Sequence, residues 1–273
     1  MTRAKPPVTF EVDIDEEQVA FFREHGWLKI DRLVSDEELE WLRATYEEIF
    51  AARQGGFPGG AFDVTRRYDE DPSEAGGHRF TQILGPEITN PELRDTEYVR
   101  NGRRIAARLL ERPEGELTNW GHLLTKPATI GYEAPWHQDE AYWDPGQDYV
   151  AVGAWMPLDD ATVDNGCLWF VPGSHQGPVL AHKHLGDDPS VHLLELDEEV
   201  DTSTAVAVPV AAGGVTFHHA RTLHHSRPNT TGRDRRAYAN EFQTVPVRRE
   251  VDADRPWFHE GTEAFAATSH RGA

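Results

Sequence analysis

The chain has 273 residues, of which 38% are hydrophobic and 10% aromatic, as in folded globular proteins and unlike disordered ones. Its 27 basic and 47 acidic residues give a formal net charge of −20 at pH 7. This charge disfavours nucleic acid and anionic membranes as partners, so any anionic ligand needs a locally basic pocket.

The composition also favours a cytoplasmic location. Cys167 is the only cysteine, which excludes a disulfide within the chain. The first residues lack the apolar run of a signal peptide, and no stretch approaches the roughly 20 apolar residues of a membrane-spanning helix. We therefore expect a soluble intracellular protein.

The first 112 residues are expected to be mostly helix and loop. Asp15 and Ser35 are each followed three residues later by Gln or Glu, the pattern of a capping box at a helix start. Apolar residues then recur at helical spacing until Gly26 and Gly55. The expected helices cover about 15–26, 35–54 and 90–110, and a short strand at 27–30 follows the first.

Residues 55–80 are rich in glycine, proline and charge, which predicts a long loop. Such a loop is either a lid over a binding site or a disordered segment. Arg66, Arg67 and Arg79 lie within it and suggest contact with an anionic or polar substrate group near the mouth of a site.

From about residue 113 the pattern changes to short β-branched, leucine and aromatic runs separated by turn residues, which predicts a sandwich or barrel. A jelly roll, or double-stranded β-helix of the cupin-like kind, would form a cup with a usable mouth. We expect one mainly β domain, in which residues 1–112 buttress a β core at 113–247 and 248–273 form a C-terminal tail. The expected strands are 116–125, 128–134, 148–157, 167–171, 191–196, 204–210, 214–219 and 235–245.

The stretch 136–143 (WHQDEAYW) contains His137 and Asp139, two potential metal ligands at positions i and i+2. On an extended strand these side chains share a face, so both can reach one ion. A distant second histidine would complete a two-histidine, one-carboxylate triad, which leaves coordination sites open and suits non-haem Fe(II) oxygenases. The alternative is a surface histidine beside a solvated aspartate.

A second cluster, 222–229 (TLHHSRPN), precedes Arg235 and Arg236. If His224 ends one strand and Arg235 begins the next, both side chains can face one cavity. An arginine there can hold a carboxylate by a two-pronged, charge-assisted pair. The alternative is that Arg235 or Arg236 only pairs with a surface acid.

These clusters, with Asn165–Leu168 (NGCL) and Pro172–His175 (PGSH), resemble the phytanoyl-CoA dioxygenase family of Fe(II)/2-oxoglutarate-dependent oxygenases. The resemblance covers roughly residues 15–245, and the motifs stand in the family's order and spacing.

The resemblance implies that His137, Asp139 and His224 are the iron ligands, because the family places a serine two residues after the distal histidine and Ser226 is there. His225 departs from the family, in which glycine is common at this position, so either neighbouring imidazole can ligate. His218 and His219 are candidates for a supporting or substrate-binding role, with core or surface histidines as the alternative.

The resemblance also assigns the co-substrate 2-oxoglutarate to Arg235, which would bind its far carboxylate with help from Ser226. Trp143 and Trp155 match positions where family members carry an aromatic residue that lines the iron pocket. Cys167 lies in an apolar run and is predicted to be buried rather than reactive.

The chemistry implied by the resemblance uses Fe(II), 2-oxoglutarate and O2, releases succinate and CO2, and hydroxylates a small molecule. Desaturation, epimerisation or cyclisation by the same oxidant remains an alternative. A related halogenase lacks the carboxylate ligand, whereas Asp139 is present. Two other classes are a non-catalytic β-barrel binding protein and a zinc hydrolase, which has no use for an arginine that holds 2-oxoglutarate.

Overall fold

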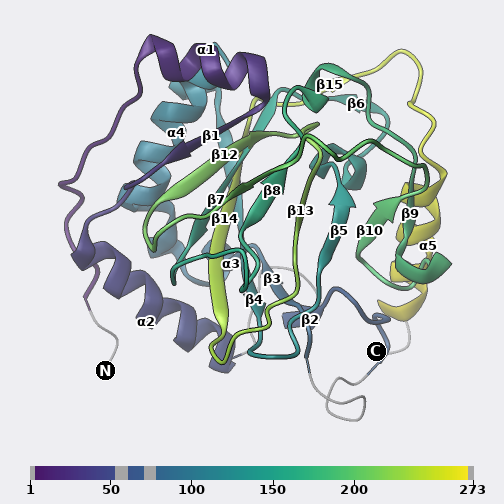
Figure 1. Ribbon diagram of the computed structural model, residues 1–273, viewed down its shortest axis with the longest axis horizontal. Coiled ribbons are helices and arrows are strands. Elements are labelled where there is room, and N and C mark those ends of the chain that lie inside the picture. The colour runs from purple at the N-terminus through teal and green to yellow at the C-terminus, as the bar shows by residue number, and fades with distance from the viewer. Residues whose placement is uncertain (1–3, 53–60, 71–77, 270–273) are drawn as a thin grey trace.

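Two antiparallel β-sheets lie at the centre of the computed structural model, which describes residues 4–52, 61–70 and 78–269 (Figure 1). The larger sheet has the strand order β1 (Trp27–Ile30), β12 (Val215–His219), β7 (Ala151–Pro157), β14 (Arg235–Gln243), β4 (Thr118–Lys126), β3 (Thr81–Leu84) and β2 (Ala61–Asp63). The smaller has the order β11 (Val206–Val208), β8 (Leu168–Phe170), β13 (His224–Ser226) and β5 (Ala134–His137). The expected fold class, a jelly-roll β core with N-terminal helices, is confirmed.

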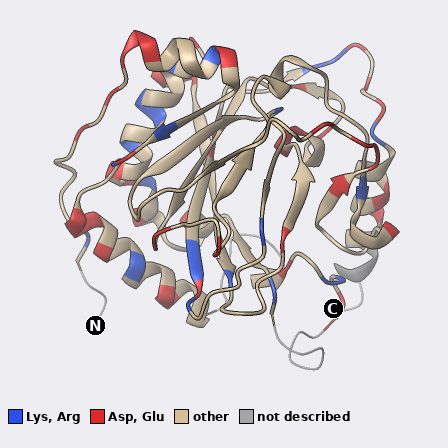
Figure 2. Ribbon diagram, viewed as in Figure 1, with Lys and Arg blue, Asp and Glu red and all other residues tan. Residues whose placement is uncertain are grey.

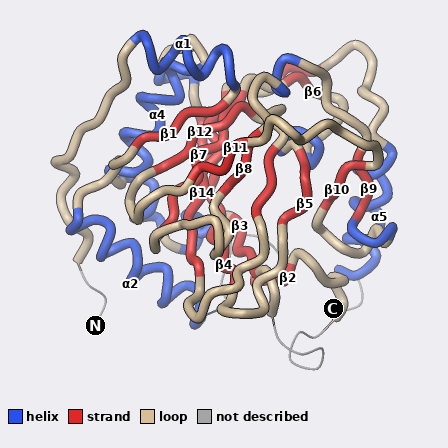
Figure 3. The backbone as a smooth tube through the Cα atoms, in the orientation of Figure 1, coloured by secondary structure: helices blue, strands red, loops and turns tan. Residues whose placement is uncertain are grey.

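The N-terminal helices cover the outer face of the larger sheet (Figure 3). They are α1 (Glu16–His25), α2 (Asp36–Ala52), α3 (Pro86–Thr89) and α4 (Glu97–Leu109). Two small ribbons, β9 (His182–His184) with β10 (Leu194–Leu196) and β6 (Gln147–Asp148) with β15 (Val247–Arg248), lie outside the two main sheets. The region expected as a C-terminal tail contains α5 (Pro256–Ser269), which packs beside β9.

Two apolar layers hold these parts together. One lies between the helices and the larger sheet and includes Leu42 and Phe217. The other lies between the two sheets and includes Phe170 and Cys167, which is buried as predicted. Figure 2 shows that charged residues are concentrated on helices and loops, while the central strands are largely uncharged apart from the start of β14. Among the described residues, no helix is both long and apolar enough to cross a bilayer.

The helix starts follow the capping chemistry read from the sequence, with one difference. The Asp15 side chain accepts a hydrogen bond from the Gln18 backbone at 2.8 Å, and the Gln18 side chain accepts one from the Asp15 backbone at 3.0 Å. The expected third helix begins later than Asn90, because Pro91–Asp95 forms a separate 3-10 turn and Thr96 caps α4.

The expected strand at 128–134 is wrong for most of its length. Residues 127–131 form a turn in which Thr129 has a φ of +63°, and the strand begins only at Ala134. Five short strands lie outside the expected ranges: β2, β3, β9, β13 and β15. Of the long loop predicted at 55–80, residues 55–60 and 71–77 lie outside the described residues, so the lid and disorder alternatives stay predictions there.

Candidate active site

Strands β5 and β13 bring together the two histidines predicted to bind metal. His137 ends β5, His224 begins β13, and the two are direct partners across the strand pair, with ring centroids 4.2 Å apart. The Nδ1 atom of His137 lies 2.7 Å from the Pro135 carbonyl, and that of His224 lies 2.9 Å from the Thr222 carbonyl. If each Nδ1–H donates to its carbonyl, each Nε2 keeps a free lone pair for a metal.

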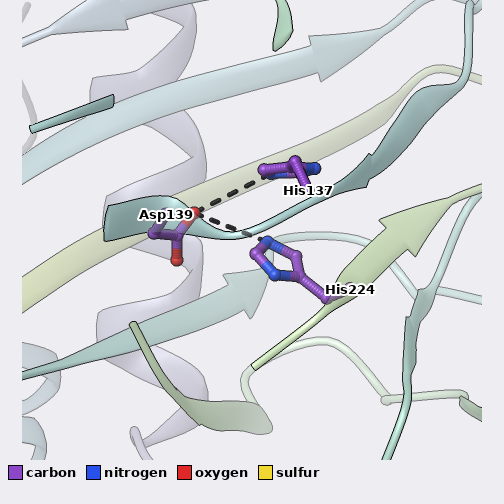
Figure 4. A group of neighbouring side chains, drawn as sticks. All are labelled: His137, Asp139 and His224. Carbon is purple, nitrogen blue, oxygen red and sulfur yellow. Dashed lines mark ion pairs between the residues drawn. The ribbon is translucent and has the colours of Figure 1, made fainter. Parts of the chain in front are cut away.

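Asp139 faces both histidines from the start of the 3-10 turn η3 (Asp139–Tyr142) (Figure 4). Its Oδ1 atom lies 3.8 Å from Nε2 of His137 and 3.5 Å from Nε2 of His224. One potential ligand atom from each residue lies within 4.8 Å of the others. Among the described residues, this group alone has the donors and spacing of a metal site.

The site holds its three groups in the protonation states that a metal requires. Burial lowers the pKa of both His137 and His224, which keeps the imidazoles neutral. Burial alone would raise the pKa of Asp139, but His224 and then the hydrogen bond from His218 lower it below its usual value. Two neutral imidazoles and an ionised carboxylate are the forms that bind Fe(II).

His218 on β12 contacts the carboxylate from behind, and a supporting role was one of the alternatives that the sequence left open. Its Nε2 atom lies 2.9 Å from Oδ2 of Asp139, which leaves Oδ1 toward the two histidines. Gly153 on β7 makes room for this contact, because a Cβ atom there would lie 2.7 Å from His218 Nε2. The fold therefore orients the candidate ligand through a second residue.

The neighbouring histidines lie outside the metal group. The ring of His225 stacks on Trp136, with centroids 4.5 Å apart and an interplanar angle of 28°. His219 accepts a hydrogen bond from the Arg221 backbone through Nδ1 at 3.1 Å. The geometry thus favours His224 over His225 as the distal ligand.

Glu140, which directly follows the candidate ligand Asp139, anchors η3 to the rest of the molecule. Its buried carboxylate lies 2.6 Å from Nε of Arg221 and 2.8 Å from Nη2 of Arg255. Arg255 also donates to the Glu140 carbonyl at 2.5 Å. The C-terminal region thereby fixes the turn that presents Asp139.

A cavity of about 250 Å³ opens beside the metal group, and Arg235 lines it. Arg235 is only 1% exposed, and its Nε and Nη1 atoms have no hydrogen-bond partner among the described residues. Its guanidinium lies 5.1 Å from the ring centroid of Trp155, which also lines the cavity. Burial lowers the pKa of Arg235 to about 10, so it stays cationic at neutral pH.

The adjacent arginine has a different environment. Arg236 pairs with Asp159 at 2.7 Å and with Glu47 at 2.6 Å, on the side of β14 away from the cavity. A buried cation with unused donors is a fitting partner for a ligand carboxylate. The structure therefore gives Arg235, and not Arg236, the environment expected of a carboxylate-binding residue.

Ser226 and Trp143 also line the cavity, and their roles at the co-substrate and the iron stay predictions. Sequence reasoning missed Lys126, a buried lysine whose Nζ lies 2.6 Å from Ser226 Oγ. A lysine two residues after the buried pair Leu123 and Leu124 was the available signal. Lys126 is not itself part of the lining, in which the missed residues include Gln82, Trp120, His122, Tyr142, His192 and Glu241.

Glu241 stands six residues after Arg235 on β14 and therefore on the same face of the strand. It is 4% exposed, and its Oε2 atom has no hydrogen-bond partner among the described residues. Burial, and then the charge of Asp139, raise the pKa of Glu241 well above its usual value. One cavity wall thus carries a cation near one end of the strand and a carboxyl group toward the other.

The three arginines near the expected loop are not part of this lining. Arg66 pairs with Glu70 at 2.6 Å, and Arg67 pairs with Asp188 at 2.7 Å. Arg79 is exposed. The positions of these three arginines therefore do not support the expected contact with an anionic substrate group.

Comparison with known proteins places this geometry in a family. A sequence model described as phytanoyl-CoA dioxygenase (PhyH) matches residues 22–237. Phytanoyl-CoA dioxygenase domain-containing protein 1 of Bos taurus is 34% identical over 120 residues, which are 43% of this chain and 41% of that protein. The chain thus spans less than half the length of the first curated relatives that it matches.

Two further relatives align over most of the chain. A probable alpha-ketoglutarate-dependent hypophosphite dioxygenase of Stutzerimonas stutzeri is 34% identical over 223 residues, 78% of this chain and 73% of that protein. The crystal structure of EvdO2 from Micromonospora carbonacea var. aurantiaca, complexed with 2-oxoglutarate, is 38% identical with a TM-score of 0.77 and covers 89% of this chain and 96% of that one. The resemblance read from the motifs is confirmed: the chain belongs to the phytanoyl-CoA dioxygenase family.

Proposed function

We propose that this chain is a cytoplasmic Fe(II)- and 2-oxoglutarate-dependent dioxygenase that hydroxylates a small molecule. The observation that carries the proposal is that the His137, Asp139 and His224 group lines the same cavity as Arg235, whose Nε and Nη1 atoms have no hydrogen-bond partner among the described residues. A metal site alone fits several enzyme classes, whereas a metal site with a buried, unpaired arginine fits a carboxylate co-substrate.

Each proposed role follows from the environment of the residue. His137, His224 and Asp139 would hold Fe(II), and Arg235 with Ser226 would hold the far carboxylate of 2-oxoglutarate. When bound, the iron and 2-oxoglutarate supply the oxidising chemistry, which consumes O2 and leaves succinate and CO2. The protein orients these groups and limits access of water to them.

The substrate would occupy the part of the cavity toward Glu241. Trp120, the register partner of Glu241, supplies apolar surface there, and the Glu241 carboxyl group supplies a polar contact. Arg235 is the only arginine or lysine in the lining contributed by the described residues. If it binds the co-substrate, this lining supplies no second cation for an anionic substrate, so we propose a neutral or cationic small molecule.

The rival functions make different predictions about this site. A non-catalytic binding protein needs neither a metal group nor a cation without a partner, and a zinc hydrolase does not need Arg235. Hydroxylation is the outcome we propose, and desaturation, epimerisation or cyclisation is the alternative, because the same site can serve each of them.

The test is to load the protein with Fe(II) without oxygen, measure 2-oxoglutarate binding by calorimetry, and then admit oxygen. We expect one 2-oxoglutarate per iron, and succinate release that increases with members of a neutral and cationic small-molecule panel. The Arg236→Ala variant is the matched control and should behave like wild type. Iron binding without 2-oxoglutarate binding would contradict the proposal.

A further inference from the structure

Lys126 and Arg235 are a pair of buried cations that face each other across two strands. Lys126 ends β4, Arg235 begins β14, and the two are direct register partners. Their exposed fractions are 0% and 1%. Like charges directly opposite each other destabilise a sheet. Within the described part of the chain, neither forms a direct ion pair with a carboxylate; Glu133 and Asp159 act on Lys126 and Arg235, respectively, only from a longer distance.

The ammonium of Lys126 has a full set of acceptors. Its Nζ atom lies 2.9 Å from the Ser226 carbonyl, 2.6 Å from Ser226 Oγ and 2.9 Å from the Arg227 carbonyl. A lysine ammonium has three hydrogens to donate, and these three acceptors use them all. Lys126 therefore has no donor left for direct contact with a ligand.

The contact with Ser226 fixes the direction of that hydroxyl group. A hydroxyl oxygen that accepts from an ammonium keeps its own hydrogen for another acceptor. Ser226 lines the cavity, as does Arg235, whose Nε and Nη1 atoms are unused. The free hydroxyl hydrogen can thus join the arginine donors at a carboxylate bound there.

We infer that Lys126 is a positioning residue for the far carboxylate of 2-oxoglutarate and acts through the hydroxyl of Ser226. The inference rests on the proposed function, because it assigns that carboxylate to this end of the cavity. The anion would sit beside two opposed cations, which removes their mutual repulsion. Burial and then the charge of Arg235 lower the pKa of Lys126 well below its usual value, so a neighbouring anion favours its charged form.

A purely structural role for Lys126 is the competing explanation. Its bonds to two carbonyl oxygens also tie the connection after β13 to the end of β4. Such a role would affect stability, or the binding of every metal-chelating anion equally. A positioning role instead distinguishes anions that have a far carboxylate from those that lack one.

The experiment measures anaerobic binding of 2-oxoglutarate and of oxalate, which chelates iron but has no far carboxylate, to Fe(II)-loaded variants. Lys126→Met should weaken 2-oxoglutarate binding about tenfold or more and leave oxalate binding within about twofold. Ser226→Ala should likewise weaken 2-oxoglutarate binding and spare oxalate binding. The double variant should bind 2-oxoglutarate no more than about twofold more weakly than Lys126→Met, because the two residues act as one unit. Lys183→Met, at a partly exposed lysine paired with Asp187, is the matched control.

The outcomes separate the inference from the function on which it rests. Wild-type protein that binds Fe(II) but no 2-oxoglutarate would overturn the proposed function, and with it this role for Lys126. Normal 2-oxoglutarate binding by wild type with an equal loss for both anions in Lys126→Met, or additive losses in the double variant, would overturn the inference alone. If Lys126→Met does not fold, Ser226→Ala decides, and unchanged 2-oxoglutarate binding by that variant overturns the inference.

Discussion

Nε2 of His218 lies 2.9 Å from Oδ2 of Asp139, and this contact joins the larger sheet to the candidate metal group. His218 comes from β12, whereas Asp139 follows β5 of the smaller sheet. A donor behind a metal-binding carboxylate fixes which oxygen faces the ion. The position of the candidate ligand therefore depends on how the two sheets pack.

Replacing His218 should weaken iron binding without abolishing it. We expect His218→Ala to lower Fe(II) affinity by about 10–100-fold, the usual effect of losing a partner of a metal ligand. His218→Asn, which can still donate a hydrogen bond, should recover part of the loss. Anaerobic metal titration measures both variants, with His219→Ala as the neighbouring control. If His218→Ala and wild type bind Fe(II) with equal affinity, the hydrogen bond from His218 to Asp139 does not contribute to metal binding.

The two adjacent histidines of β13 should respond differently to substitution. His224→Ala should abolish specific iron binding, since its Nε2 lies 3.5 Å from Asp139 Oδ1. His225→Ala should retain it, since that ring stacks on Trp136 instead. Iron content after anaerobic loading and desalting provides the measurement. The reverse pattern would transfer the ligand role to His225 and leave the enzyme class unchanged.

The adjacent arginines of β14 should separate co-substrate binding from surface pairing. Arg235→Ala leaves a bound carboxylate without its buried partner and should cost about 2–5 kcal/mol of 2-oxoglutarate binding free energy. Arg236→Ala loses partly exposed ion pairs with Asp159 and Glu47 and should change stability by no more than about 1 kcal/mol. If Arg236→Ala alone greatly weakens 2-oxoglutarate binding, the opposite face of β14 binds the co-substrate.

Burial of His122 and His192 predicts that the metal-free protein loses stability in mild acid. Burial lowers the pKa of each from 6.5 to about 4. Between these pH values the unfolded chain binds more protons than the folded one, so the free energy of unfolding falls as pH decreases. Each histidine should contribute about 2 kcal/mol by pH 4, after allowance for its partial exposure.

Urea unfolding of metal-free protein at pH 7.5, 6.0 and 5.0 measures this dependence. The variant His122→Gln should lose less stability than wild type over the same interval, because one titrating group is gone. Lys183→Met again provides a control with an unchanged pH profile. Parallel profiles for His122→Gln and wild type would mean that His122 stays accessible to protons in the folded state.

The candidate metal site was readable from the sequence because its chemistry lies in short motifs. His137 and Asp139 are two residues apart, and the position of Ser226 distinguishes His224 from His225. The pairing of β5 with β13 then brings these motifs together. The register of β14 was also predictable, because Arg235 begins the strand and Arg236 faces the opposite side.

Other parts of the site depend on register between distant strands, which the sequence alone does not specify. Lys126 and Arg235 are 109 positions apart and meet only because β4 pairs with β14. Glu241 resembles any acidic residue until the strand pairing buries it. The predicted strand at 128–134 failed for a local reason, since Thr129 adopts a left-handed conformation within a turn.

The most direct test of the central claim is the Fe(II) stoichiometry of wild type, His137→Ala and Asp139→Ala, measured anaerobically with each protein's fold checked by circular dichroism. We predict one tightly bound iron per wild-type chain and none in the two folded variants. Substitution removes one of the three groups whose ligand atoms lie within 4.8 Å of one another. Full iron occupancy in folded Asp139→Ala would contradict the assignment of this group as the metal centre.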